Sequence, residues 1–344
     1  MTKILGIGNA LVDSEFAVSE AQLTQSGLTK GNMTLASSTE QAELANYLHT
    51  QNLVATKKSS GGSGANSIFA IASLLGIKNQ TVYVCRVGDD TQGKFYLDDL
   101  QQGGVATLPT ALVAGETTGS CFVLVTPDGE RTMQTFLGTS AEMNDSNLDL
   151  NHAILAGFGV GDWLYIEGYL AFNPSAQSAI NRLKNFAHEK GMKIAISFAD
   201  PAVVKFGRDG IDAMLAGGVD AIFCNCEEAM IFTGQAEHKS ATLDLLKVAK
   251  LPVVTNGSND TLVATVNNLT YIPTPRVENL IDTNGAGDNF AGGFLYGLMQ
   301  GDKQDYDLAK CGKLASAVAG RVVQSFGARL KVAQYQSVLK GFTN

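Results

Sequence analysis

The chain has 344 residues, 45% of them hydrophobic and 17% charged, which predicts a soluble globular protein of one large or two smaller domains. Its net charge of −8 and its lack of lysine- and arginine-rich runs argue against nucleic acid or an anionic membrane surface as a main partner. Five scattered cysteines argue against a disulfide framework, and the absence of a signal-peptide pattern or a long apolar run predicts a cytoplasmic location without a membrane span.

Short apolar segments bounded by turn residues alternate with helical patterns along the chain. They are typical of buried parallel strands and occupy residues 3–9, 81–87, 163–167, 193–198, 221–224 and 252–255. Apolar residues at helical spacing fill 66–75, and Pro174 precedes a second helical pattern over 175–190. This alternation predicts an α/β layered fold with a mainly parallel sheet.

Two regions interrupt the alternation and predict a small separate sheet. Residues 11–35 and 107–137 have β patterns, and residues 127–129 (Pro-Asp-Gly) form a good hairpin turn. Paired together, these regions could cover the mouth of the α/β core as a lid. A further hairpin around residues 267–268 is expected to extend the main sheet. Residues 57–64 (KKSSGGSG) resemble a linker in composition, but the helical pattern that begins directly after them argues against that interpretation.

The most informative motif is Asp-Thr-Asn-Gly-Ala-Gly-Asp at residues 282–288, which a helical pattern follows at once. Unpaired amides at a helix start carry partial positive charge, and the small residues 285–287 would let a phosphate approach them. Asp288 would stand beside that phosphate, placed to accept a proton from an attacking hydroxyl. An Asn-Gly turn with an N-capping Asp explains one acid, but not the acid pair, the small residues and the helix together. The motif therefore predicts phosphoryl transfer.

Two motifs near the N-terminus suggest contacts to hydroxyl groups. Residues 61–66 (Gly-Gly-Ser-Gly-Ala-Asn) precede a helical pattern, so their backbone could approach a ligand while Asn66 donates to and accepts from vicinal hydroxyls. A flexible turn into the helix is the alternative interpretation. Asp13, after the first strand, could bind sugar hydroxyls or could simply occupy a turn. Leu11 stands where a dinucleotide fingerprint needs its third glycine.

Two later motifs could serve a nucleotide and its metal. Asn225 and Glu228 would share a face of a first helical turn, where they could hold the water shell of Mg²⁺, although Asn225 could also be a plain helix cap. A strand ending at Thr255 and Gly257 can present a hydroxyl and an amide to a nucleotide. The chain contains no Walker loop, so a P-loop kinase is not expected.

Together these motifs resemble those of the ribokinase-like (PfkB-type) family of carbohydrate and nucleoside kinases, over residues 6–327. The matching motifs, in chain order, are Gly8-Asn9 with Asp13, the loop 61–66, Gly88-Asp89-Asp90 with Gly93, Asn225-x-x-Glu228, Thr255-x-Gly257 and the 282–288 motif. The last motif is highly specific, and the others are individually modest. The start of the chain and the form of the last motif are more similar to the adenosine-kinase branch than to ribokinase.

The resemblance implies a three-layer α/β/α ribokinase-like core with a mainly parallel central sheet, formed by residues 1–12, 36–106 and 138–344. It implies a small discontinuous β-sheet lid at 13–35 and 107–137. It also implies transfer of the γ-phosphoryl group of ATP to a hydroxymethyl group of a nucleoside or sugar, with Mg²⁺ and in many members a monovalent cation.

The resemblance assigns a role to each matching residue. Asp288 is implied as the general base, and the anion hole would comprise Asn284, Gly285, Ala286 and Gly287. The acceptor would contact Asp13, Gly62, Ser63 and Asn66. ATP would contact Asn225, Thr255, Gly257, Gly285 and Gly287. Mg²⁺ would be held through water by Asn225 and Glu228, and Asp282 would belong to the monovalent-cation loop.

Several questions stay open at this point. Arg131 could reach substrate or phosphate from the lid, or could be a solvated hairpin charge. The acceptor could be adenosine, another nucleoside or a free sugar, and the protein a monomer or a homodimer. The alternatives are a catalytically silent sugar- or nucleotide-binding regulator, which would need no base, and an NAD-dependent oxidoreductase, against which Leu11 argues.

Overall fold

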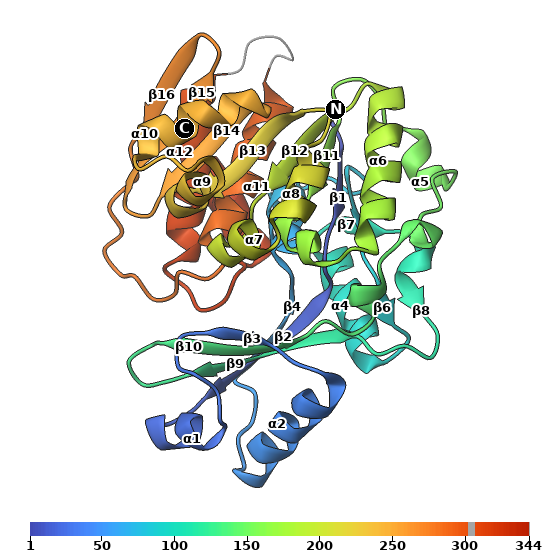
Figure 1. Ribbon diagram of the computed structural model, residues 1–344, viewed down its shortest axis with the longest axis vertical. Coiled ribbons are helices and arrows are strands. Elements are labelled where there is room, and N and C mark those ends of the chain that lie inside the picture. Colours follow the sequence, from blue (N-terminus) through green and yellow to red (C-terminus); the bar gives the residue numbers. More distant parts are fainter. Residues whose placement is uncertain (302–306, 344) are drawn as a thin grey trace.

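The computed structural model of the chain describes residues 1–301 and 307–343, and it contains a large and a small β-sheet (Figure 1). The large sheet has nine strands in the order β16 (Asn268–Ile272), β15 (Asn259–Thr265), β14 (Ala249–Asn256), β13 (Val219–Asn225), β12 (Lys193–Ser197), β11 (Trp163–Ile166), β1 (Ile4–Ile7), β5 (Thr81–Val84) and β7 (Val105–Thr107). In this spatial order, the strands from β14 at one end to β7 at the other run parallel to one another. Strands β15 and β16 extend the sheet beyond β14 by antiparallel pairing. The predicted α/β fold, its six core strands and the hairpin at residues 267–268 are confirmed.

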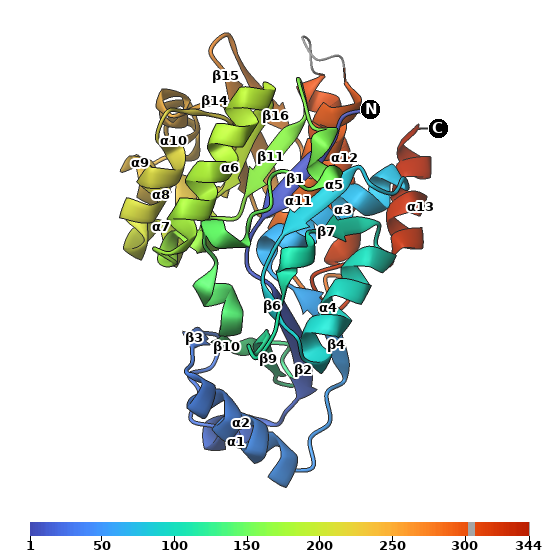
Figure 2. The same ribbon diagram turned by 90° about the vertical axis from the view of Figure 1, so that its right-hand side faces the viewer.

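Helices cover both faces of the large sheet and make three layers (Figure 2). One face carries α3 (Ser63–Leu75), α4 (Thr91–Gln102), α11 (Ala286–Gln300), α12 (Leu308–Val322) and α13 (Val332–Thr343). The other carries α5 (Ala153–Ala156), α6 (Ala176–Lys190), α7 (Pro201–Phe206), α8 (Arg208–Leu215), α9 (Cys226–Thr233) and α10 (His238–Asp244). Successive residues of β11 alternate between the two cores, Trp163 and Tyr165 on one side, Leu164 and Ile166 on the other.

Three glycines inside α11 bring its backbone close to its neighbours. A Cβ atom at Gly292 would lie 2.7 Å from the carbonyl oxygen of Ser67 in α3. A Cβ atom at Gly293 would lie 2.9 Å from the Cα atom of Ala315 in α12, and Gly297 is similarly tight against Cys311. Since real Cβ atoms do not approach so closely, the three helices pack at this distance only because these side chains are absent.

The small sheet lies below the large one in Figure 1 and contains strands β3 (Met33–Leu35), β10 (Arg131–Phe136), β9 (Gly119–Val125), β2 (Leu11–Ala17) and β4 (Lys57–Gly61) in that order. Helices α1 (Glu20–Gln25) and α2 (Ser38–Thr50) pack against this sheet through a small core around Leu23, Leu44 and Leu124. A separate two-stranded pair joins β6 (Val87–Gly88) to β8 (Leu112–Val113). The predicted hairpin at residues 127–129 and the pairing of residues 11–35 with 107–137 are confirmed.

Residues 57–64 are not a linker, as the helical pattern after them indicated: Lys57–Gly61 pairs antiparallel with β2, and Ser63 begins α3. One local prediction differs from the structure. Residues 11–35 are not wholly β, since α1 begins after a capping box at Ser19 and Gln22. The division of the chain into core and lid segments remains a prediction. No helix within residues 1–301 and 307–343 has the length and apolar character to cross a bilayer.

Candidate active site

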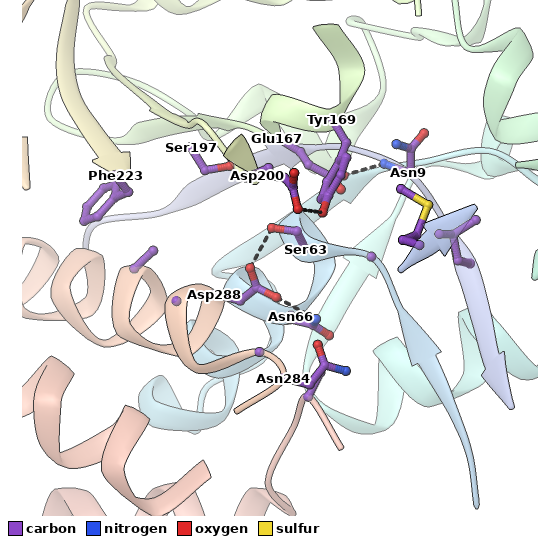
Figure 3. A pocket seen from close by; sticks show the side chains of 18 of the residues that line it. Asn9, Ser63, Asn66, Glu167, Tyr169, Ser197, Asp200, Phe223, Asn284 and Asp288 are labelled. Atoms are coloured by element: carbon purple, nitrogen blue, oxygen red, sulfur yellow. Dashed lines mark hydrogen bonds between the residues drawn. The ribbon is translucent and has the colours of Figure 1, made fainter. Parts of the chain in front are cut away.

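A cavity of about 380 Å³ opens between the large and the small sheet. The large-sheet side provides Glu167 and Ser197 at the carboxyl ends of parallel strands, and the start of α11 with Asp288 (Figure 3). Asn225, at the end of β13, lines the same side. The small sheet provides a mainly apolar wall lined by Leu11, Met33, Leu35, Cys121, Val123, Met133, Thr135 and Leu137. Ligands of open parallel sheets usually bind at this edge, beyond the carboxyl ends of the strands.

Asp288 is held from both sides by α3, 222 to 225 residues earlier in the chain. Ser63 Oγ donates to Asp288 Oδ1 at 2.6 Å, and Asn66 Nδ2 donates to Asp288 Oδ2 at 2.8 Å (Figure 3). Burial raises the pKa of Asp288, while these two hydrogen bonds and the positive charge of Arg329 act in the opposite direction. The result is a fixed carboxylate in the cavity whose proton affinity exceeds that of an exposed aspartate.

The loop before α11 presents a tight turn to the cavity. Gly285 has a φ of 73°, and a Cβ atom there would lie 2.5 Å from the carbonyl oxygen of Ala328, so the turn requires glycine. A Cβ atom at Gly287 would have no neighbouring element within 4 Å. Asn284, Gly285 and Gly287 line the cavity. Ala286 is not among the lining residues, and its amide donates to the carbonyl oxygen of Thr283 at 3.2 Å.

The predicted acceptor contacts gather at the same place. Asp13, Gly62, Ser63 and Asn66 all line the cavity. Gly62 has a φ of 96° and lies against the carbonyl of Asn9, which tightens the approach to α3. Burial raises the pKa of Asp13 to about 7, although Arg329 lowers it. The structure therefore brings all four residues within one cavity with Asp288.

Asn225 and Glu228 form a reciprocal capping box at the start of α9. Asn225 Oδ1 accepts from the Glu228 amide at 2.9 Å, and the carboxylate oxygens of Glu228 accept from the Asn225 amide and from Asn225 Nδ2 at 3.0 and 2.6 Å. Both residues line the cavity, and burial raises the pKa of Glu228 to about 7. A buried carboxylate beside a neutral amide fits Mg²⁺ held through water, since the cation would offset the free-energy cost of burying the negative charge.

Of the remaining predicted residues, only Thr255 lines the cavity. Gly257, in the turn between β14 and β15, is not among its lining residues. Arg131 and Asp282 are also outside the lining set and form an ion pair with each other. Arg131 donates to Glu15 as well, at 2.7 Å, so in this structure it is neither a solvated charge nor directed to the cavity.

Glu167, Tyr169 and Asp200 are among the polar residues of the cavity that the sequence analysis did not identify. Glu167 is buried, accepts from the Asn9 amide at 2.6 Å, and has its pKa raised to about 8 by that burial. Tyr169 donates to Asp200 at 3.4 Å across the next strand end. Each residue lies at or shortly after the end of a strand that the apolar pattern does predict, so the common carboxyl edge of the sheet could have identified them.

Comparison with known proteins identifies, over most of the chain, the PfkB-type family that the sequence motifs resemble. The family model for pfkB family carbohydrate kinases matches residues 31–334. Adenosine kinase from Saccharomyces cerevisiae is 26% identical over 310 residues, 86% of this chain and 88% of that protein.

Solved structures of similar proteins cover nearly the whole length. A probable sugar kinase from Rhizobium etli is 31% identical, with a TM-score of 0.84 and 99% of each chain covered. Adenosine kinase from Sinorhizobium meliloti is 29% identical, with the same TM-score and the same coverage. The ribokinase-like α/β fold expected from the motifs is therefore confirmed.

Proposed function

Because the chain belongs to the pfkB family of carbohydrate kinases, in its adenosine-kinase-like branch, we propose that Asp288 is the general base of an ATP-dependent nucleoside kinase. As a member of this family, the protein is a phosphotransferase that acts on an alcohol group of a nucleoside or sugar. That activity replaces the two alternatives raised from the sequence, a silent binding protein and an NAD-dependent oxidoreductase.

The observation that carries the proposal is the position of Asp288. It lies at the N-terminal turn of α11, beside the small residues of the proposed anion hole, and it accepts hydrogen bonds from Ser63 and Asn66. A hydroxymethyl oxygen near the carboxylate would give up its proton to Asp288 as it attacks the γ-phosphorus in line. The amides of Gly285 and Gly287, with the positive end of the α11 dipole, would stabilise the charge on the transferring group.

The nucleotide would lie on the side of the cavity formed by β13, β14 and the loop before α11. Thr255 offers a hydroxyl, and Asn225 and Glu228 would hold Mg²⁺ through water, as their donor set allows. The cation supplies neutralising charge to the phosphates when bound. A monovalent-cation role for Asp282 stays a prediction, and its carboxylate accepts from the amides of Asn284 and Gly327 and from Arg131.

A nucleoside is the acceptor that the cavity suits best. Asp13 and Asn66 would bind the ribose hydroxyls, next to the reacting carboxylate. The apolar wall of the small sheet, including Met33, Val123 and Met133, would lie against a flat base. Similar proteins named adenosine kinase support adenosine among nucleosides.

An acceptor panel tests the proposal. ADP release is measured with ATP and Mg²⁺ over adenosine, inosine, ribose, fructose and phosphorylated sugars, and kcat/KM is compared. We expect the highest kcat/KM with adenosine and a 5′-monophosphate product identified by mass spectrometry. A preference for a free sugar would overturn the nucleoside assignment, and no ADP release with any acceptor would overturn the kinase itself.

A further inference from the structure

Arg329 lies between α12 and α13, and its side chain is only 7% exposed. Hydrogen bonds connect the backbone around it to the start of α11 and to the loop before that helix. The Gly327 amide donates to Asp282 at 2.7 Å, and Asn289 Nδ2 donates to the carbonyl oxygen of Ala328 at 2.8 Å. The guanidinium stacks on Phe69 of α3, with 4.8 Å between its central carbon and the ring centroid. The arginine is thus fixed in place by both helices that form the proposed reaction centre.

The contacts of Arg329 determine how Asn66 is oriented. Arg329 Nε donates to Asn66 Oδ1 at 2.6 Å, while Nη1 donates to Ser60 Oγ and, at 3.3 Å, to Asp99. Arginine can only donate, so the Asn66 atom that faces it must be the carbonyl oxygen. The Asn66 amide nitrogen therefore faces Asp288, to which it donates at 2.8 Å.

We infer that Arg329 is a positioning residue for the phosphoryl transfer: it holds the Asn66 amide so that one N–H bonds Asp288 and the other remains for an acceptor hydroxyl. The inference rests on the proposed role of Asp288 as the base. Without Arg329, the Asn66 amide could rotate and place its carbonyl oxygen against the carboxylate, which repels it. A misplacement of about 1 Å in such a contact can cost about 10²-fold in rate.

The charge of Arg329 acts on the same carboxylates. It lowers the pKa values of Asp288 and Asp13, which burial raises. Arg131 and Lys57 also lower the pKa of Asp13, whereas Arg329 is the cation that lowers the pKa of Asp288. The negative charge of Asp288 in turn raises the pKa values of Tyr165, Glu167, Tyr169, Glu228 and Tyr335. None of these five groups can supply a positive charge in place of the arginine.

The first test compares Arg329→Met, which keeps much of the side-chain length but removes charge and donors, with wild type. We expect kcat/KM for the acceptor to fall about 10²-fold, and KM for ATP to stay within about twofold of wild type. The acidic limb of the pH profile should move to higher pH, because Asp288 then ionises less readily. Arg182→Met, on an exposed face of α6 where Arg182 donates to the carbonyl of Asp145, is the matched control and should match wild type.

Arg329→Lys separates charge from geometry. Lysine keeps the charge but lacks the planar fork that reaches Asn66 and Ser60 together. We expect an acidic limb near that of wild type, with kcat still reduced. If Arg329→Met does not fold, as judged by circular dichroism and ATP affinity, wild-type kinetics of Arg329→Lys would overturn the inference.

A double variant tests whether the effect passes through Asn66. In an Asn66→Ala background, Arg329→Met should reduce kcat/KM by less than about threefold further. A loss as large as in the wild-type background would overturn the inference, as would an unchanged rate and pH profile of Arg329→Met alone. An active wild type with an inactive Asp288→Asn and an unaffected Arg329→Met would refute only this inference. An inactive wild type, or a fully active Asp288→Asn, would refute the proposed function instead.

Discussion

Arg131 in β10 and Asp282 in the loop before α11 form an ion pair that joins the small sheet to the proposed anion hole. Their side chains are 14% and 3% exposed, and Arg131 also pairs with the buried Glu15. Replacing Arg131 by Met leaves two buried carboxylates without this countercharge, so we expect the free energy of unfolding to fall by about 3 kcal/mol. Urea denaturation of the purified variant measures the change.

The exposed pair of Arg208 and Asp212 on α8 provides the control for that prediction. Arg208→Met should change stability by no more than about 1 kcal/mol, because water screens the pair. A similar loss of unfolding free energy in both arginine variants would show that the buried ion pair stabilises the fold no more than the exposed pair does. Adding Asp282→Asn to Arg131→Met should recover part of the loss, since one unpaired charge is then removed.

Asp288→Asn should keep the fold and ATP binding but lose turnover. Asparagine can still accept from Ser63, yet it cannot take the hydroxyl proton, and removal of a general base typically costs about 10²–10⁴-fold in kcat. ADP release at saturating ATP and acceptor measures the loss. Asp98→Asn, on the exposed side of α4, is the matched control, and wild-type turnover in Asp288→Asn would contradict the assignment.

Gly285 and Gly287 should respond differently to alanine. Gly285→Ala places a Cβ atom against the carbonyl of Ala328 at positive φ, so we expect lower stability and lower activity together. Gly287→Ala meets no neighbour, so Tm should not fall, but the methyl group would occupy space proposed for the phosphate. Thermal melts and KM for ATP, measured on both variants, separate the effects; an unchanged KM in Gly287→Ala would argue against the anion hole.

Glu228→Gln should weaken the response to Mg²⁺ while the helix start survives. Glutamine preserves the capping box with Asn225, so the Tm should remain close to wild type. Loss of the negative charge should raise the Mg²⁺ concentration for half-maximal activity about tenfold. A Mg²⁺ titration of activity measures this, and an unchanged midpoint would show that Glu228 is only a cap.

Stability should fall as pH rises from about 5 to about 8. Burial raises the pKa values of Glu167, Asp13 and Glu228 to about 8, 7 and 7, above those of an unfolded chain. The folded state therefore holds more protons than the unfolded state in this window, and raising the pH releases them at a cost of stability. Each group contributes up to about 1.4 kcal/mol per pH unit.

Glu167→Gln tests the largest of these contributions. Its amide oxygen can still accept from the Asn9 amide, and it has no proton to lose. The slope of unfolding free energy against pH between 5 and 8 should become shallower than in wild type. Glu142→Gln, an exposed control, should leave the slope unchanged. The same slope in Glu167→Gln and wild type would mean that Glu167 does not titrate with folding.

Prediction from the sequence succeeded where local patterns are strong. Buried parallel strands such as 163–167 are continuous apolar runs, and the unusual set of residues in the 282–288 motif indicated the family to which the chain belongs. The sequence did not show that residues 57–61 are a strand, because β4 gains its partners only from β2, more than 40 residues away. Arg329 was missed for a similar reason: its contact with Asn66 joins residues 263 apart, and nothing local marks it.

The glycines inside α11 set Asp288 in place by main-chain contact with α3 and α12. Main-chain atoms are the same in every protein, so exchanges among the surrounding apolar side chains can be absorbed elsewhere without shifting the start of this helix. The apolar core of such a protein can therefore accept many substitutions during evolution, while the position of its reacting carboxylate stays the same.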